Sequence, residues 1–138
     1  MSSSTGSDST IPTTRVAIIG YGLAGAVFHA PLVASTPGMT VAAIVTNNPE
    51  RHKQAQRDFP KTTILSSAGQ IWRDPTLYDL VVVATPNRSH LPLGIAAMNA
   101  GLPVVIDKPI SASVSNAEQL ISTSERTGKL LTVFQNRR

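Results

Sequence analysis

Short apolar runs alternate along the chain with longer segments in which apolar residues recur at helical spacing. Residues 16–19 form a wholly apolar run, which is typical of a strand buried on both faces of a sheet. Residues 80–84 form the clearest run, because three consecutive valines favour extended backbone. In all, the pattern predicts six strands, over residues 16–19, 40–45, 62–65, 80–84, 103–106 and 130–134.

The intervening segments predict helices, several with recognisable start and stop signals. Pro49 suits the first turn of a polar helix, since its missing N–H has no partner there in any case. Ser89 can cap a helix that stops at Gly101, and Ser115 with Glu118 has the spacing of a capping box. The predicted helices cover residues 23–34, 49–58, 67–72, 89–99 and 115–128.

Strands that alternate with helices over short loops indicate an α/β fold with a doubly wound parallel sheet, the Rossmann plan of about six strands. We expect this domain to span residues 15–138. Residues 1–14 carry nine Ser or Thr and no apolar period, so we expect a disordered tail. Ligands of such sheets bind beyond the carboxyl ends of the strands, which makes the residues after each strand the candidates for chemistry.

A complete G-x-G-x-x-G follows the first strand and precedes a helix, which is the setting of a dinucleotide-binding turn. Gly20 permits the tight turn, Gly22 lets the backbone approach a pyrophosphate, and Gly25 lets the helix pack close to the strand. The amides of Leu23 and Ala24 begin the helix and can point at the anion. A purely structural turn is the alternative.

The second strand ends at Thr46 and Asn47, where an NAD-binding domain would place an acid for the adenosine ribose. Thr and Asn can instead donate hydrogen bonds to a 2′-phosphate, and Arg51 lies one helical turn further on. The sequence therefore favours NADP over NAD. Alternatively, Arg51 is a solvated helix residue and the site accepts both cofactors.

Two further strand ends carry candidate residues on the nicotinamide side. Thr85, Pro86 and Asn87 form a turn into the next helix, and His90 lies in its first turn. Unpaired N–H groups nearby disfavour a charged imidazole, so we expect His90 to be neutral. A capping or packing role is the alternative for this histidine.

Asp107, Lys108 and Pro109 follow the fifth strand, and a charge pair there is costly unless it faces a cleft. A lysine near the positive nicotinamide can have a lowered pKa and move a substrate proton, which makes Lys108 the candidate catalytic residue. A structural salt link is the alternative. After the last strand, Asn136 could hydrogen-bond a ribose or carboxamide, or simply start a surface helix.

Composition narrows the class of protein further. The chain of 138 residues has a net charge of +4, but its basic residues are scattered, which favours an anionic small molecule over nucleic acid as the ligand.

Cysteine is absent, which excludes disulfides and thiolate chemistry. The three histidines fall on separate elements, so no metal site is predicted. Without a signal peptide or an apolar run of about 18 residues, a cytoplasmic protein with no membrane partner is expected.

Together these residues resemble the Gfo/Idh/MocA family of oxidoreductases, named after glucose–fructose oxidoreductase and inositol dehydrogenase. The order Thr85-Pro86-Asn87, His90 and then Asp107-Lys108-Pro109 is similar to the signature T-P-N-x-x-H followed by E-K-P. Asp107 departs from the signature's Glu and is one methylene shorter, which puts its reach to the nicotinamide ribose in doubt. The ending Q-N-R-R resembles members that act on inositols and related polyols or sugars.

The resemblance implies a homo-oligomeric two-domain enzyme that passes a hydride between the nicotinamide and a secondary alcohol or carbonyl. Lys108 then assists proton transfer, together with an Asp/His pair from a C-terminal domain that this chain lacks. We therefore expect weak binding of NADP(H) and no turnover by this chain alone. A non-catalytic NADP-binding, redox-sensing module is the alternative. A methyltransferase is disfavoured, because it would place an acid where Thr46 stands.

Overall fold

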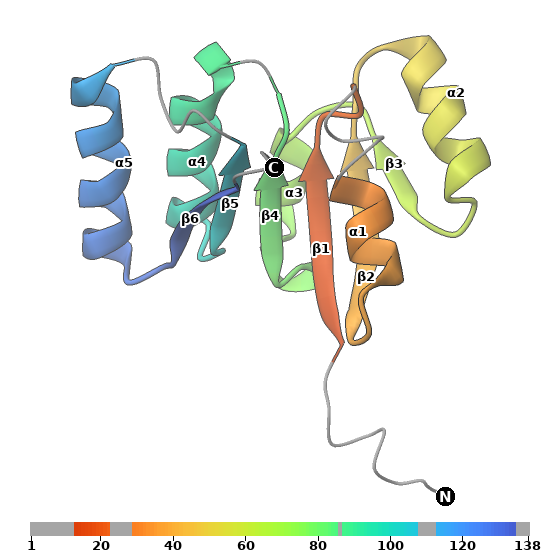
Figure 1. Ribbon diagram of the computed structural model, residues 1–138, viewed down its shortest axis with the longest axis horizontal. Coiled ribbons are helices and arrows are strands. Elements are labelled where there is room, and N and C mark those ends of the chain that lie inside the picture. The colour runs from red at the N-terminus through yellow and green to blue at the C-terminus, as the bar shows by residue number, and fades with distance from the viewer. Residues whose placement is uncertain (1–12, 23–28, 86, 108–112, 135–138) are drawn as a thin grey trace, which may run out of the picture.

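The computed structural model describes residues 13–22, 29–85, 87–107 and 113–134 (Figure 1). These residues form strands and helices in strict alternation over most of their length. The strands are β1 Thr14–Ile19, β2 Met39–Val45, β3 Thr63–Leu65, β4 Leu80–Val83, β5 Val104–Asp107 and β6 Leu131–Phe134. The α-helices are α1 Ala30–Ser35, α2 Pro49–Asp58, α3 Gly69–Arg73, α4 His90–Asn99 and α5 Val114–Thr127. Short 3-10 helices at Pro75–Leu77 and Asn87–Ser89 precede β4 and α4.

All described strand pairs are parallel, in the order β3-β2-β1-β4-β5-β6. The chain therefore starts in the middle of the sheet, winds to one edge, and returns to β4 on the other side of β1. The Ala84 amide donates to the Ile19 carbonyl at 2.9 Å, so β1 and β4 stay paired to their carboxyl ends. This confirms the predicted doubly wound sheet and locates its switch point between β1 and β4.

Alternate residues of the central strand face two separate apolar layers. Val16 and Ile18 pack in one core cluster with residues of α1 and α2. Ala17 and Ile19 pack in the other, with residues of α3, α4 and α5. Figure 1 shows α1 in front of the sheet and α3 behind it. Because both faces are covered, the residues of β1 and β4 that lie in the middle of the sheet, 16–19 and 81–83, are buried and apolar, as the unbroken runs in the sequence predicted.

Two predicted helix caps need correction. The last helix starts at Val114, and the side chain that caps it is Ser113, which accepts from the Asn116 amide at 3.1 Å. The predicted capping residue, Ser115, lies inside the first turn instead. Ser89 does precede α4, but its side chain makes no capping hydrogen bond, because a 3-10 turn already leads the backbone into the helix.

The predicted helix 49–58 matches α2 at both ends, and the other predicted elements differ from the structure by one or two residues at their described ends. The predicted helix 67–72 begins at Gly69, since Ser67 turns back to accept from the Gly69 amide at 3.1 Å. Of the predicted helix 23–34, the part up to residue 28 lies outside the described residues, as does the tail up to residue 12. None of the helices in the described part of the chain combines the length and apolarity needed to span a bilayer.

Candidate functional site

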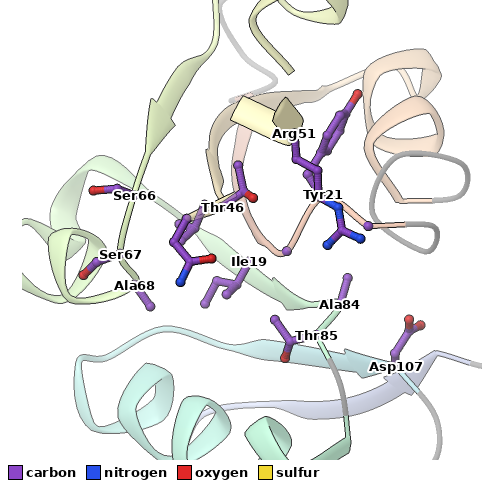
Figure 2. Close-up of a pocket in the computed structure, with 14 residues that line it drawn as sticks. Ile19, Tyr21, Thr46, Arg51, Ser66, Ser67, Ala68, Ala84, Thr85 and Asp107 are labelled. Atoms are coloured by element: carbon purple, nitrogen blue, oxygen red, sulfur yellow. The ribbon is translucent and has the colours of Figure 1, made fainter. Parts of the chain in front are cut away.

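A cavity of about 640 Å³ opens at the carboxyl ends of β1, β2, β4 and β5, across the switch point of the sheet. Its size is within the range of small-molecule and cofactor sites. Figure 2 shows side chains from both halves of the sheet facing it. The structure brings seven of the predicted site residues together in its lining: Gly20, Gly22, Thr46, Asn47, Arg51, Thr85 and Asp107.

Gly20 makes the first turn possible because it lies against the end of β4. Its amide donates to the Val45 carbonyl at 2.8 Å, and its φ of +103° is one that other residues rarely adopt. A Cβ atom here would lie 2.9 Å from the Ala84 carbonyl oxygen. Backbone strain and a backbone clash therefore both require glycine at this position.

Gly22 lines the cavity next to the positively charged side chain of Arg51. A Cβ at Gly22 would lie 3.3 Å from Nη1 of Arg51, whose side chain comes from the first turn of α2. In Figure 2 the Arg51 guanidinium points toward the glycine turn, into the cavity. The guanidinium group thus lies against the backbone of the glycine turn, where it can contact an anion bound at that turn.

Tyr21, which the sequence interpretation passed over, anchors the turn to α2. Its side chain is buried, its hydroxyl donates to Asp58 Oδ2 at 2.7 Å, and its ring meets Phe59 edge-on at 6.5 Å. Burial, reinforced by the hydrogen bond to Asp58, raises the pKa of the Tyr21 hydroxyl well above its usual value. The glycine turn and the helix that carries Arg51 are therefore fixed to each other.

At the end of β2, a local hydrogen-bond pattern leaves donors available to a ligand. Asn48 Oδ1 accepts from the Glu50 and Arg51 amides at 2.9 and 3.1 Å, so Asn48 caps α2. The Asn48 amide in turn donates to Thr46 Oγ1 at 3.3 Å. The Thr46 hydroxyl hydrogen and the Asn47 side chain are then the groups that can face a ligand at this end of the cavity.

The loop after β3 also lines the cavity, through Ser66, Ser67 and Ala68. It is held by Gln70, whose Oε1 accepts from the Ser66 and Ser67 amides at 3.0 and 3.1 Å. These residues were missed by the sequence interpretation. The rule that ligands meet the residues after each strand would have found them, had it been applied to the third strand as it was to the others.

Thr85 and His90 shape the loop after β4. Thr85 Oγ1 is buried without a hydrogen-bond partner among the residues that the structure describes. His90 is only 2% exposed, and its Nε2 lies 2.9 Å from the Thr85 carbonyl oxygen. Since a carbonyl only accepts, Nε2 carries a hydrogen. His90 does not line the cavity; it holds the turn that presents Thr85 to it.

Asp107 closes the cavity at the end of β5, and its partner comes from a distant part of the chain. Its Oδ1 lies 2.8 Å from Nε2 of His29, which directly precedes α1. Six other candidates, Leu23, Ala24, Gly25, Pro86, Lys108 and Asn136, lie outside the described residues. Asn87 is placed by its backbone only, in the 3-10 turn before α4.

These features fit a dinucleotide better than a metal ion. The side-chain-free floor at Gly22, the guanidinium beside it and the unpartnered Thr85 hydroxyl suit an elongated anionic ligand with many acceptors and hydroxyls. Within the described ranges, His, Asp and Glu side chains nowhere form a group of three that could hold a metal.

Comparison with known proteins agrees with this geometry. Residues 14–135 match the family model GFO_IDH_MocA, described as an oxidoreductase family with an NAD-binding Rossmann fold. The chain is 43% identical over 124 residues to uncharacterized oxidoreductase YdgJ of Escherichia coli (strain K12). It is 36% identical over 128 residues to scyllo-inositol 2-dehydrogenase (NADP(+)) IolW of Bacillus subtilis (strain 168). These matches cover 90% and 93% of this chain and 35% of each relative.

A solved oxidoreductase from Agrobacterium radiobacter, in complex with NAD+, L-tartaric acid and magnesium, superposes with a TM-score of 0.84 at 29% identity. The match covers 91% of this chain and 36% of that one. The chain thus spans about a third of the length of the relatives it matches. On these grounds the chain belongs to the Gfo/Idh/MocA oxidoreductase family, and the described residues fold as its NAD-binding Rossmann domain.

Proposed function

We propose that this chain is the cofactor-binding part of an oxidoreductase that uses NADP(H) in preference to NAD(H). The proposed reaction is hydride transfer between the nicotinamide and a secondary alcohol or carbonyl of a sugar, inositol or related polyol. The observation that carries the proposal is the cavity at the switch point, where the Arg51 guanidinium lies against the side-chain-free Gly22.

The preference for NADP(H) rests on the charge at the end of β2. Arg51, Thr46 and Asn47 line the cavity here, whereas the one acidic residue in its described lining, Asp107, comes from β5. A second cavity of about 420 Å³ shares Thr46 and Asn47 and is lined also by His52 and Lys53 of α2. Donors and positive charge without an opposing carboxylate suit a 2′-phosphate.

The residues of the glycine turn would hold the pyrophosphate, including the amides of Leu23 and Ala24, and Gly25 would let the helix pack close to the strand. Thr85, Asn87, Asp107 and Asn136 would contact the nicotinamide half, and His90 would hold the loop of Thr85. In the direction of alcohol oxidation, bound NADP+ supplies the hydride acceptor. Lys108 would accept the hydroxyl proton of the alcohol at Nζ.

The substrate class is supported by relatedness alone. The Bacillus subtilis relative carries the name of a scyllo-inositol 2-dehydrogenase that uses NADP+, and it is 36% identical to this chain. A C-terminal domain that completes the substrate site is part of the proposal, as is a homo-oligomeric full-length enzyme. Assay of the full-length protein on a panel of inositols and sugars tests the substrate class.

Side-by-side titration of this chain with NADPH and NADH tests the site and the choice of cofactor together. We expect NADPH to bind more tightly, and Arg51→Gln to weaken NADPH by about tenfold more than it weakens NADH, because the lost charge-assisted bond to the 2′-phosphate contributes about 1.5–3 kcal/mol. Arg57→Gln, in the last turn of the same helix, is the matched control and should bind both like the wild type. Equal affinity for the two cofactors would overturn the preference, and binding of neither would overturn the function.

A further inference from the structure

Of the two contacts between basic and acidic side chains among the described residues, the pair of His29 and Asp107 is the one that reaches the cavity. It joins residues 78 positions apart in the sequence: the start of α1, which follows the glycine turn, and the end of β5. The pair therefore links the two halves of the doubly wound sheet at the edge where ligands bind. The His29 side chain is only 4% exposed.

The geometry assigns the two oxygens of Asp107 to different partners. An ionised carboxylate only accepts hydrogen bonds, so the hydrogen at 2.8 Å belongs to His29 Nε2, which donates to Oδ1. In the described part of the chain no other donor reaches Asp107, whose side chain remains 18% exposed. Oδ2 is thus the atom through which Asp107 can accept from a ligand hydroxyl in the cavity.

A carboxylate in this place needs such a partner. Partial burial beside apolar strand ends disfavours an ionised group unless a donor compensates for the lost water. A buried donor also restricts the orientation of the aspartate, since His29 directly precedes α1 and its side chain has little freedom to follow a rotating carboxylate. A short acidic side chain held in this way presents Oδ2 in a constant direction.

We propose that His29 is a positioning residue for the nicotinamide half of the cofactor. It orients Asp107 so that Oδ2 accepts from the hydroxyls of the nicotinamide ribose. The inference rests on the proposed function, because it assigns a ligand group to the same cavity. If the pair had a purely structural role, its loss would weaken the binding of both halves of the cofactor. A positioning role predicts that only binding of the nicotinamide half is weakened.

The test compares a full ligand with a ligand that lacks the nicotinamide half. NADPH and adenosine 2′,5′-bisphosphate are titrated calorimetrically into this chain and into His29→Leu, His29→Gln and Asp107→Asn. We expect His29→Leu and Asp107→Asn to bind NADPH about tenfold more weakly, with the affinity for the bisphosphate unchanged within about twofold. His29→Gln, whose amide can place a donor near the position of Nε2, should recover most of the NADPH affinity.

The pair of Arg15 and Asp79 is the matched control, because it lies at the amino ends of the strands, away from the cavity. Asp79→Asn should leave both affinities unchanged. Equal weakening of both ligands, or no weakening, in folded His29→Leu and Asp107→Asn would overturn the inference. If circular dichroism shows that His29→Leu does not fold, the affinities of the near-isosteric Asp107→Asn and of His29→Gln test the inference instead. Wild-type chain that binds neither ligand would instead overturn the proposed function, and the inference with it.

Discussion

At the scale of single residues, Gly20 and Gly22 are glycine for different physical reasons. Gly20 has a positive φ and no room for a Cβ, because the Ala84 carbonyl oxygen lies in the way. Gly22 has no positive φ, and the nearest atom to a Cβ is the end of the flexible Arg51 side chain. The first glycine is therefore required by the fold and the second by the ligand that we propose.

Alanine at each position separates these two requirements. Gly20→Ala should lower the free energy of unfolding by about 1–3 kcal/mol, the usual cost of a strained backbone position, as measured by urea denaturation. Gly22→Ala should stay within about 1 kcal/mol of the wild type, because Arg51 can move aside, and yet bind NADPH at least about tenfold more weakly. A loss of stability at Gly22 equal to that at Gly20 would contradict this assignment.

At the scale of elements, the six strands could be predicted because each is a short, mainly apolar or β-branched run between turn residues. Helix ends were harder, since two serines compete to start α5. Ser115 and Glu118 have the sequence spacing of a capping box, but the chain enters the helix two residues earlier and Ser113 becomes the cap. Local spacing cannot decide such a choice, because the direction from which the chain arrives depends on packing elsewhere.

Removing each hydroxyl in turn checks which serine caps α5. Ser113→Ala should destabilise the protein by about 1 kcal/mol, because the Asn116 amide loses its acceptor. Ser115→Ala should be neutral or slightly stabilising, since alanine is the better helix former inside the first turn. Midpoints of chemical denaturation measured on the two variants would reveal the reverse order if the capping box at Ser115 formed in solution.

At the scale of the whole molecule, the residues of the candidate site could be predicted only where their position in the sequence determines their position in the sheet. Residues that follow strands meet at one edge of a parallel sheet, which is why Thr46, Thr85 and Asp107 were found. His29 could not be found in this way, because its contact with Asp107 joins a helix and a strand from opposite halves of the sheet. Tyr21 was hidden for a similar reason, since its partner Asp58 lies at the far end of α2.

Whether the domain serves an enzyme or a protein that only binds the cofactor can be tested by substituting Lys108 in the full-length protein. If the domain serves an enzyme, Lys108→Ala should lower kcat by about 10²–10⁴-fold, the usual contribution of a proton-transferring group, with NADPH affinity nearly unchanged. Lys129→Ala, at the opposite end of the domain just before β6, is the control and should leave both quantities unchanged. A full-length wild type that binds NADPH tightly but turns over no inositol or sugar would favour a redox-sensing module, because a sensor of NADP(H) needs the same cofactor cavity but no catalytic lysine.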